Sequence, residues 1–127
     1  MDLFLRSAPA FAITLSSTAA HRLLTAGLAE YRAGRFWHAH EQWEKLWRRL
    51  AAPEKTWVQG LILLAAAAWH LDRNRERVAR RLLALAAVRL VGCPELPALT
   101  GASELASRAA AAAASAEIRL PPVTIAE

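Results

Sequence analysis

The fold is decided by "WVQGLILLAAAAW", residues 57–69, a run without any charged side chain. The run is too short to span a bilayer, because a membrane helix needs about 20 apolar residues. Gln59 lies inside it, and Lys55 and His70 bracket it. A helix that is apolar all round is normally enclosed by other helices. The run therefore predicts a buried central helix that starts near Pro53 and reaches about Asp72.

The composition agrees with an all-α protein of one domain. The chain has 127 residues, of which 55% are hydrophobic and 21% charged. That length fits a single domain, and that balance argues against disorder. Five glycines and one tyrosine leave few signals for strands or hairpins.

Two helices are predicted before the central one, over about residues 18–33 and 36–50. Leu24, Leu28 and Tyr31 follow the spacing of one buried helix face. Ser17 or Thr18 can cap the first helix, and Gly34 offers the left-handed conformation that ends it. The short link predicts an antiparallel hairpin. The buried stripe of the second helix is expected to be Phe36, His40, Trp43, Trp47 and Leu50.

Two more helices are predicted after the central one, over about residues 75–91 and 103–117. Val78, Leu82, Leu85 and Leu90 are expected to face inward from the first of them. The last helix is mostly alanine, so its thin apolar stripe should pack loosely. The predicted fold class is an all-α, compact antiparallel bundle of four core helices with an appended fifth helix.

The ends of the chain are expected to lie outside the bundle. We expect a flexible N-terminal segment over residues 1–17, a single helical domain over 18–120 and an extended tail over 121–127. The N-terminus has an apolar stretch, but Asp2 and Pro9 argue against a secretory signal. Cys93 is the lone cysteine, so the chain has no internal disulfide.

The second helix carries an unusual group of polar residues within "FWHAHEQWEKLWRR", residues 36–49. With a helical step of about 100 degrees, His40 lies close to the apolar stripe and Glu44 follows one turn later. Gln59 and His70 share a face of the central helix, which should run antiparallel to the second. The candidate ligand-binding set is therefore His40, Glu41, Glu44, Trp47, Gln59 and His70.

Three interpretations of this set remain open. First, His40, Glu41, Glu44 and His70 could hold a divalent metal such as Zn, Mn or Fe, whose usual ligands include imidazole and carboxylate. Second, the set could bind a small organic ligand or carry out acid–base chemistry, although no nucleophile motif or phosphate loop accompanies it.

The third interpretation is a structural lock inside a protein-interaction module. Glu44 would then bond Gln59 or a tryptophan indole, and His40 would bond a backbone carbonyl of the first helix. Whether the chain is an enzyme stays open under all three interpretations.

The net charge of +5 raises the question of an anionic partner. A cluster of arginines runs from Arg73 to Arg81. Asp72 and Glu76 dilute it and no helix-turn-helix motif is present, so we expect neither nucleic acid nor a membrane as a partner. Trp37 lies off the buried stripe and is a candidate for a pocket wall or for a contact in a homo-oligomer.

The runs "YRAGRFWHAHEQWEKLWR", "WVQGLILLAAAAWHL" and "RNRERVARRLLALAAVRL" together resemble domain-of-unknown-function family 309 over about residues 21–91. The resemblance implies an all-helical fold and a cytoplasmic, prokaryotic setting, and it implies no established activity. It selects one set of positions, which are Gly34, Phe36, Ala39, His40, Glu41, Glu44, Trp47, Gln59, Gly60 and His70.

Overall fold

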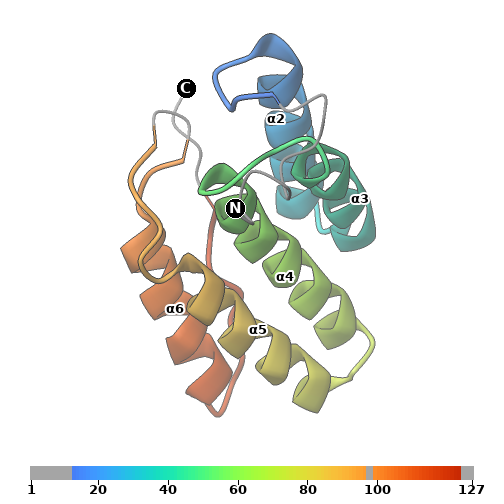
Figure 1. Ribbon diagram of the computed structural model, residues 1–127. Coiled ribbons are helices and arrows are strands. Elements are labelled where there is room, and N and C mark those ends of the chain that lie inside the picture. The colour runs from blue at the N-terminus through green and yellow to red at the C-terminus, as the bar shows by residue number, and fades with distance from the viewer. Residues whose placement is uncertain (1–12, 97–98, 124–127) are drawn as a thin grey trace.

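A computed structural model of the chain describes residues 13–96 and 99–123, and these form five α-helices and no strand (Figure 1). The prediction of an all-α bundle is confirmed. The helices are α2 (Thr18–Arg32), α3 (Phe36–Trp47), α4 (Glu54–Asp72), α5 (Glu76–Leu90) and α6 (Ala102–Ala114).

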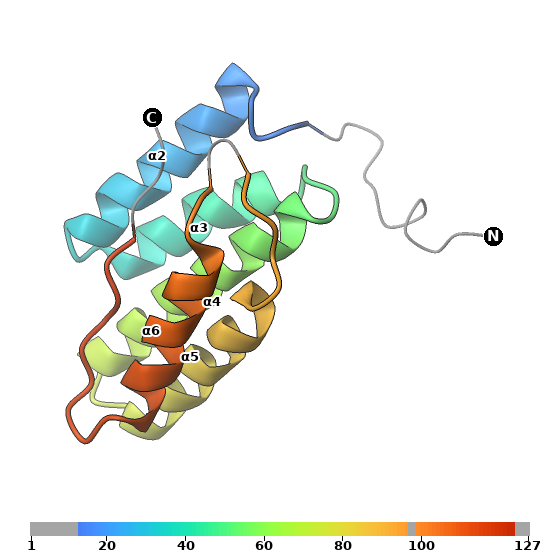
Figure 2. The same cartoon turned by 90° about the vertical axis from the view of Figure 1, so that its left-hand side faces the viewer.

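The longest helix, α4, lies between the α2–α3 pair and the α5–α6 pair (Figures 1 and 2). Each helix packs against the next one along the chain. Leu61, Leu64 and Ala68 of α4 are all 0% exposed. The prediction that "WVQGLILLAAAAW" forms the central helix is therefore confirmed.

The α2–α3 hairpin forms for the reasons that the sequence suggests. The Ser17 side chain accepts a hydrogen bond from the Ala20 N–H at the start of α2. Gly34 has a φ of +80°, which glycine adopts at little cost, and it separates the two helices. The α3 helix ends at Trp47, so the predicted extension to Leu50 is absent.

The buried face of α3 is rotated from its predicted position. Its buried residues are Ala39, Trp43 and Leu46, with the i, i+4, i+7 spacing of one face. His40 and Trp47 are only partly buried, at the edge of this face. A pattern of large apolar residues overlooks Ala39, although a small side chain lets a neighbouring helix approach closely.

The inward face of α5 also differs from the prediction. Its buried residues are Ala79, Leu83, Ala86 and Leu90, so only Leu90 of the predicted set is fully buried. Leu85 is 42% exposed, and its predicted inward position was wrong. Two alanines share the buried face with Leu83 and Leu90, whereas the predicted Val78 and Leu82 are only partly buried.

The alanine-rich α6 does not pack loosely. Five of its residues are buried, namely Ala102, Leu105, Ala106, Ala109 and Ala112. Alanine side chains allow close approach of two helices, so a thin stripe can still form a tight contact. The appended fifth helix is therefore an integral part of the bundle.

Beyond α6 the chain returns along the molecule to α2 (Figure 2). The Tyr31 hydroxyl donates to the Pro121 carbonyl oxygen at 3.0 Å, and the Arg32 guanidinium donates to the Val123 carbonyl oxygen at 3.2 Å. Burial raises the pKa of Tyr31 far above its ordinary value. The beginning of the expected C-terminal tail is thus held against the first helix.

The expected flexibility of residues 1–17 concerns mostly residues outside the described ranges, and so does the end of the expected tail over 124–127. Among the described residues, none of the helices has both the length and the hydropathy needed to cross a bilayer.

Candidate functional site

Six side chains line a hollow of about 300 Å³ on the surface of α3. Their spacing of i, i+3, i+4, i+7, i+8 and i+11 places them on one face of the helix, beside its buried face. They are Trp37, His40, Glu41, Glu44, Lys45 and Arg48. The structure therefore brings three predicted site residues together at one hollow: His40, Glu41 and Glu44.

His40 and Glu44 form the inner edge of the hollow. Nδ1 of His40 lies 3.5 Å from Oε2 of Glu44, and these side chains are 18% and 34% exposed. The Nδ1 atom is buried and has no hydrogen-bond partner among the described residues. The other oxygen of Glu44, Oε1, accepts a hydrogen bond from Arg48. A carboxylate that faces Nδ1 favours the proton on that nitrogen, and Nε2 then remains available to accept a hydrogen bond or bind a metal.

Trp37 forms the aromatic wall of the hollow. It is 46% exposed, and its ring stacks on His40 with a centroid distance of 4.8 Å and an interplanar angle of 5°. On the other side, Trp69 of α4 lies 5.2 Å from Trp37, and His70 lies 4.9 Å from Trp69. The two candidate histidines thus lie at opposite ends of a row of aromatic rings.

His70 has a separate environment at the end of α4. Its Nδ1 atom is buried without a hydrogen-bond partner among the described residues. Burial lowers the pKa of His70 below its usual value of 6.5, and the nearby charges of Arg75 and Arg73 lower it further. Arg73 lies over the Trp69 ring at 3.9 Å. We infer a neutral imidazole at pH 7.

Trp47 and Gln59 do not line the hollow. The Trp47 ring lies under the Lys55 ammonium at 4.3 Å, and its Nε1 atom is buried without a hydrogen-bond partner in the described part of the chain. Gln59 is partly buried in α4. The predicted ligand-binding set is therefore divided: His40, Glu41 and Glu44 line the α3 hollow, Trp47 lies at the end of α3, and Gln59 and His70 lie on α4.

The four proposed metal ligands do not form one group. Over residues 13–96 and 99–123, no three His, Cys, Asp or Glu side chains are placed to hold one metal ion together. His70 is separated from His40 by the rings of Trp37 and Trp69. Binding of Zn, Mn or Fe remains a prediction.

The hydrogen bonds of the proposed lock are also absent within the described ranges. Glu44 accepts a hydrogen bond from Arg48 and faces His40 at 3.5 Å, and it does not bond Gln59 or an indole. Two other tryptophans form hydrogen bonds between separate segments of the chain. Trp43 Nε1 donates to the Leu24 carbonyl oxygen at 3.1 Å, and Trp57 Nε1 donates to the Pro94 carbonyl oxygen at 3.1 Å.

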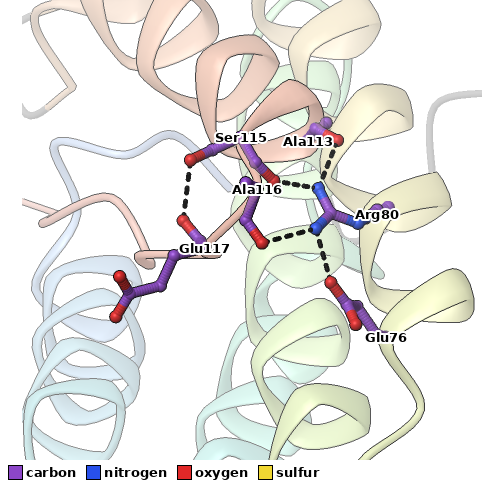
Figure 3. Close-up of polar contacts among 6 residues, drawn as sticks. All are labelled: Glu76, Arg80, Ala113, Ser115, Ala116 and Glu117. Carbon is purple, nitrogen blue, oxygen red and sulfur yellow. Dashed lines mark hydrogen bonds and ion pairs between the residues drawn. The ribbon is translucent and has the colours of Figure 1, made fainter.

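The arginines of the cluster have different environments. Arg80 points toward the end of α6, where its guanidinium donates to carbonyl oxygens of Ala113, Ser115 and Ala116, while Glu76 accepts from the same group (Figure 3). Because α6 ends at Ala114, these carbonyl groups have no hydrogen-bond donor within the helix. Arg80 therefore caps a neighbouring helix.

Sequence reasoning missed Lys45, Arg48 and Trp69 as part of this region. Arg48 could have been found, because it follows Glu44 by four residues and such pairs face each other on a helix. Lys45 follows Glu41 with the same spacing. Trp69 gave no such signal, because only the packing of α3 on α4 brings it beside Trp37.

Residues 24–82 match a family described as "Domain of unknown function (DUF309)". This segment is similar to that family. The resemblance identified from the three sequence runs is thereby confirmed, and the matched residues include the whole α3 hollow and all of α4. The comparisons with curated proteins and with solved structures found no match.

Proposed function

We propose that this protein binds a small polar ligand in the hollow on α3, with His40 and Glu44 as the central recognition pair. The observation that carries the proposal is the Nδ1 atom of His40, which is buried, lies 3.5 Å from Glu44 and has no hydrogen-bond partner in the described chain. Leaving such an atom unpaired costs about 1–3 kcal/mol. Ligand binding would compensate by drawing Glu44 into hydrogen-bond contact with Nδ1, since site geometry often tightens only when the ligand binds.

The remaining side chains suggest the class of ligand. Glu41 and Lys45 line the hollow, and neither forms an ion pair with a described residue. A carboxylate accepts hydrogen bonds and an ammonium donates them. A small zwitterion, with an amine near Glu41 and an acid group near Lys45, satisfies both. The exposed ring of Trp37 offers contact area to its apolar part.

A divalent metal is the second candidate ligand. An imidazole with a carboxylate behind one nitrogen is typical of a metal-bound histidine. His40 and Glu44 have this arrangement, and Glu41 lies next to them on the rim. Zinc or manganese would then bind at Nε2 of His40, with further positions left for water or for a small anion. We propose no reaction at this site.

Substitutions in the hollow distinguish a binding site from a structural lock, because only a lock should lose much stability when His40 or Glu44 is replaced. We expect His40→Ala to change the free energy of unfolding by less than about 0.5 kcal/mol, because removing an unpaired group offsets lost packing. We expect an equally small change in Glu44→Gln, because the amide oxygen can still accept from Arg48 and a partly exposed ion pair contributes little. The wild-type melting temperature should rise with free amino acids, or with zinc or manganese, and His40→Ala should abolish the rise.

His21→Ala is the matched control, because His21 is exposed on α2 away from the hollow. It should keep both the stability and the ligand response of the wild type. A loss of more than about 2 kcal/mol in His40→Ala, together with no response of the wild type to any of these ligands, would make the pair structural.

A further inference from the structure

The outward face of α5 combines large apolar side chains with unpaired arginines. Four large hydrophobic residues are exposed in the described chain, and three of them lie on α5 or at its end: Leu85 at 42%, Val88 at 63% and Val91 at 64%. Their i, i+3, i+6 spacing places them along one side of the helix. We call this set, with the arginines described next, the outer α5 face.

Three arginines accompany the apolar residues on this face, namely Arg77, Arg81 and Arg89. Within residues 13–96 and 99–123 none of them takes part in an ion pair, whereas Arg80 on the inner side of the same helix is fully engaged. With about 100 degrees per residue, these arginines fall within the same half of the helix as Leu85 and Val88. Glu76 lies on the opposite side and does not neutralise them.

A solvated helix face normally carries charges of both signs and few large apolar residues. Exposed apolar residues that gather in one place mark contact sites more often than scattered ones do. Arginine is also the charged residue that protein interfaces favour. The outer α5 face therefore has the composition of an interface rather than of a solvated surface.

We propose that the outer α5 face docks an acidic amphipathic helix of another protein. Charge complementarity selects this partner: the face offers three guanidinium groups and no carboxylate, so its partner needs carboxylates beside its apolar residues. A second copy of this chain would bring arginines against arginines. A lipid surface is less well matched, because the face carries no tryptophan or phenylalanine.

The outer α5 face shares no residue with the α3 hollow. Either proposal can therefore be disproved while the other stands. The probe is a designed helical peptide of about five turns, with leucines along one side and glutamates along both borders. A second peptide replaces every glutamate by lysine. Each is titrated into the isotope-labelled full chain, and backbone amide signals report both affinity and position.

The glutamate peptide should bind and shift the amide signals of residues 81–91. Arg81→Glu and Val88→Ser should each weaken that binding about tenfold or more, and added salt should weaken it further. Arg22→Glu, a charge reversal at an exposed position of α2, is the control and should leave it unchanged. The lysine peptide should bind the double variant Arg77→Glu, Arg81→Glu better than it binds the wild type.

Four results would overturn the proposal. The first is equal binding of the two peptides to the wild type, and the second is binding that maps away from α5. The third is a homodimer in sedimentation experiments that Val88→Ser dissociates, which would make a second copy the occupant. The fourth is co-sedimentation with phosphatidylserine vesicles that Val88→Ser abolishes, which would make a membrane the occupant.

Discussion

At the scale of single residues, the α2–α3 hairpin depends on one tryptophan and one glycine. Trp43 is 0% exposed, and its indole donates to the backbone of α2 at Leu24. Gly27 leaves room for the ring, because a Cβ atom at that position would lie 2.2 Å from Trp43 Nε1. Contact at that distance forces the ring or the helix to move. The indole hydrogen bond therefore requires glycine at position 27.

We expect Gly27→Ala to destabilise the protein by about 1–3 kcal/mol, the usual cost of overpacking a core. Alanine is the better helix former by about 0.5–1 kcal/mol, so helix propensity alone predicts the opposite sign. Urea denaturation measures the change. Ala29→Gly, at an exposed position of the same helix, is the control for propensity. A stabilised Gly27→Ala protein would show that Trp43 is not packed as described.

Some of these residue-scale features could be predicted from the sequence and others could not. The His40–Glu44 pair follows from its spacing on one helix, and so does the Glu44–Arg48 pair. The role of Gly27 depends on a ring that lies on another helix. Local spacing carries no information about such a partner.

At the scale of elements, α6 is held to α5 by both alanine packing and one side chain. The Arg80 guanidinium donates to three carbonyl oxygens at the end of α6 (Figure 3). In the sequence, Arg80 and Arg81 are neighbouring members of one basic cluster. Their roles differ because successive residues of a helix point about 100 degrees apart, and only Arg80 faces α6.

We expect Arg80→Met to lower the free energy of unfolding by about 1.5–3 kcal/mol, the usual contribution of hydrogen bonds to a charged group. Methionine keeps much of the apolar stem, so the loss reports the guanidinium. Arg81→Met is the matched control and should change stability by less than about 0.5 kcal/mol. Amide exchange should become faster in α6 of the Arg80 variant, and equal effects of the two variants would contradict the capping role.

The predicted faces of α3 and α5 show where periodicity fails. In both helices the contact surface includes alanines, Ala39 in α3 and Ala79 and Ala86 in α5. Sequence patterns follow large apolar residues, so they placed Leu85 inside although it is 42% exposed. Alanines share these contacts with large residues such as Trp43 and Leu90, so a pattern that follows only large residues misplaces the buried face.

At the scale of the whole molecule, the fold follows from one helix that is apolar on every side. Such a helix must be enclosed, and α4 lies between two helix pairs (Figure 1). That much was predictable from "WVQGLILLAAAAW". The placement of the candidate site was not, because the expected meeting of His40 with Gln59 or His70 depends on how α3 turns against α4. Trp37 and Trp69 fill that space instead.

In the function proposed for this protein, the α3 hollow binds a small polar ligand through His40 and Glu44. The most direct measurement is a series of amide spectra of the isotope-labelled full chain with the common free amino acids, and separately with zinc, up to millimolar concentrations. We expect shifts that concentrate at residues 37–48, saturate with at least one of these ligands and vanish in His40→Ala. Unchanged spectra with every ligand, or saturating shifts confined to other helices, would contradict the proposed function.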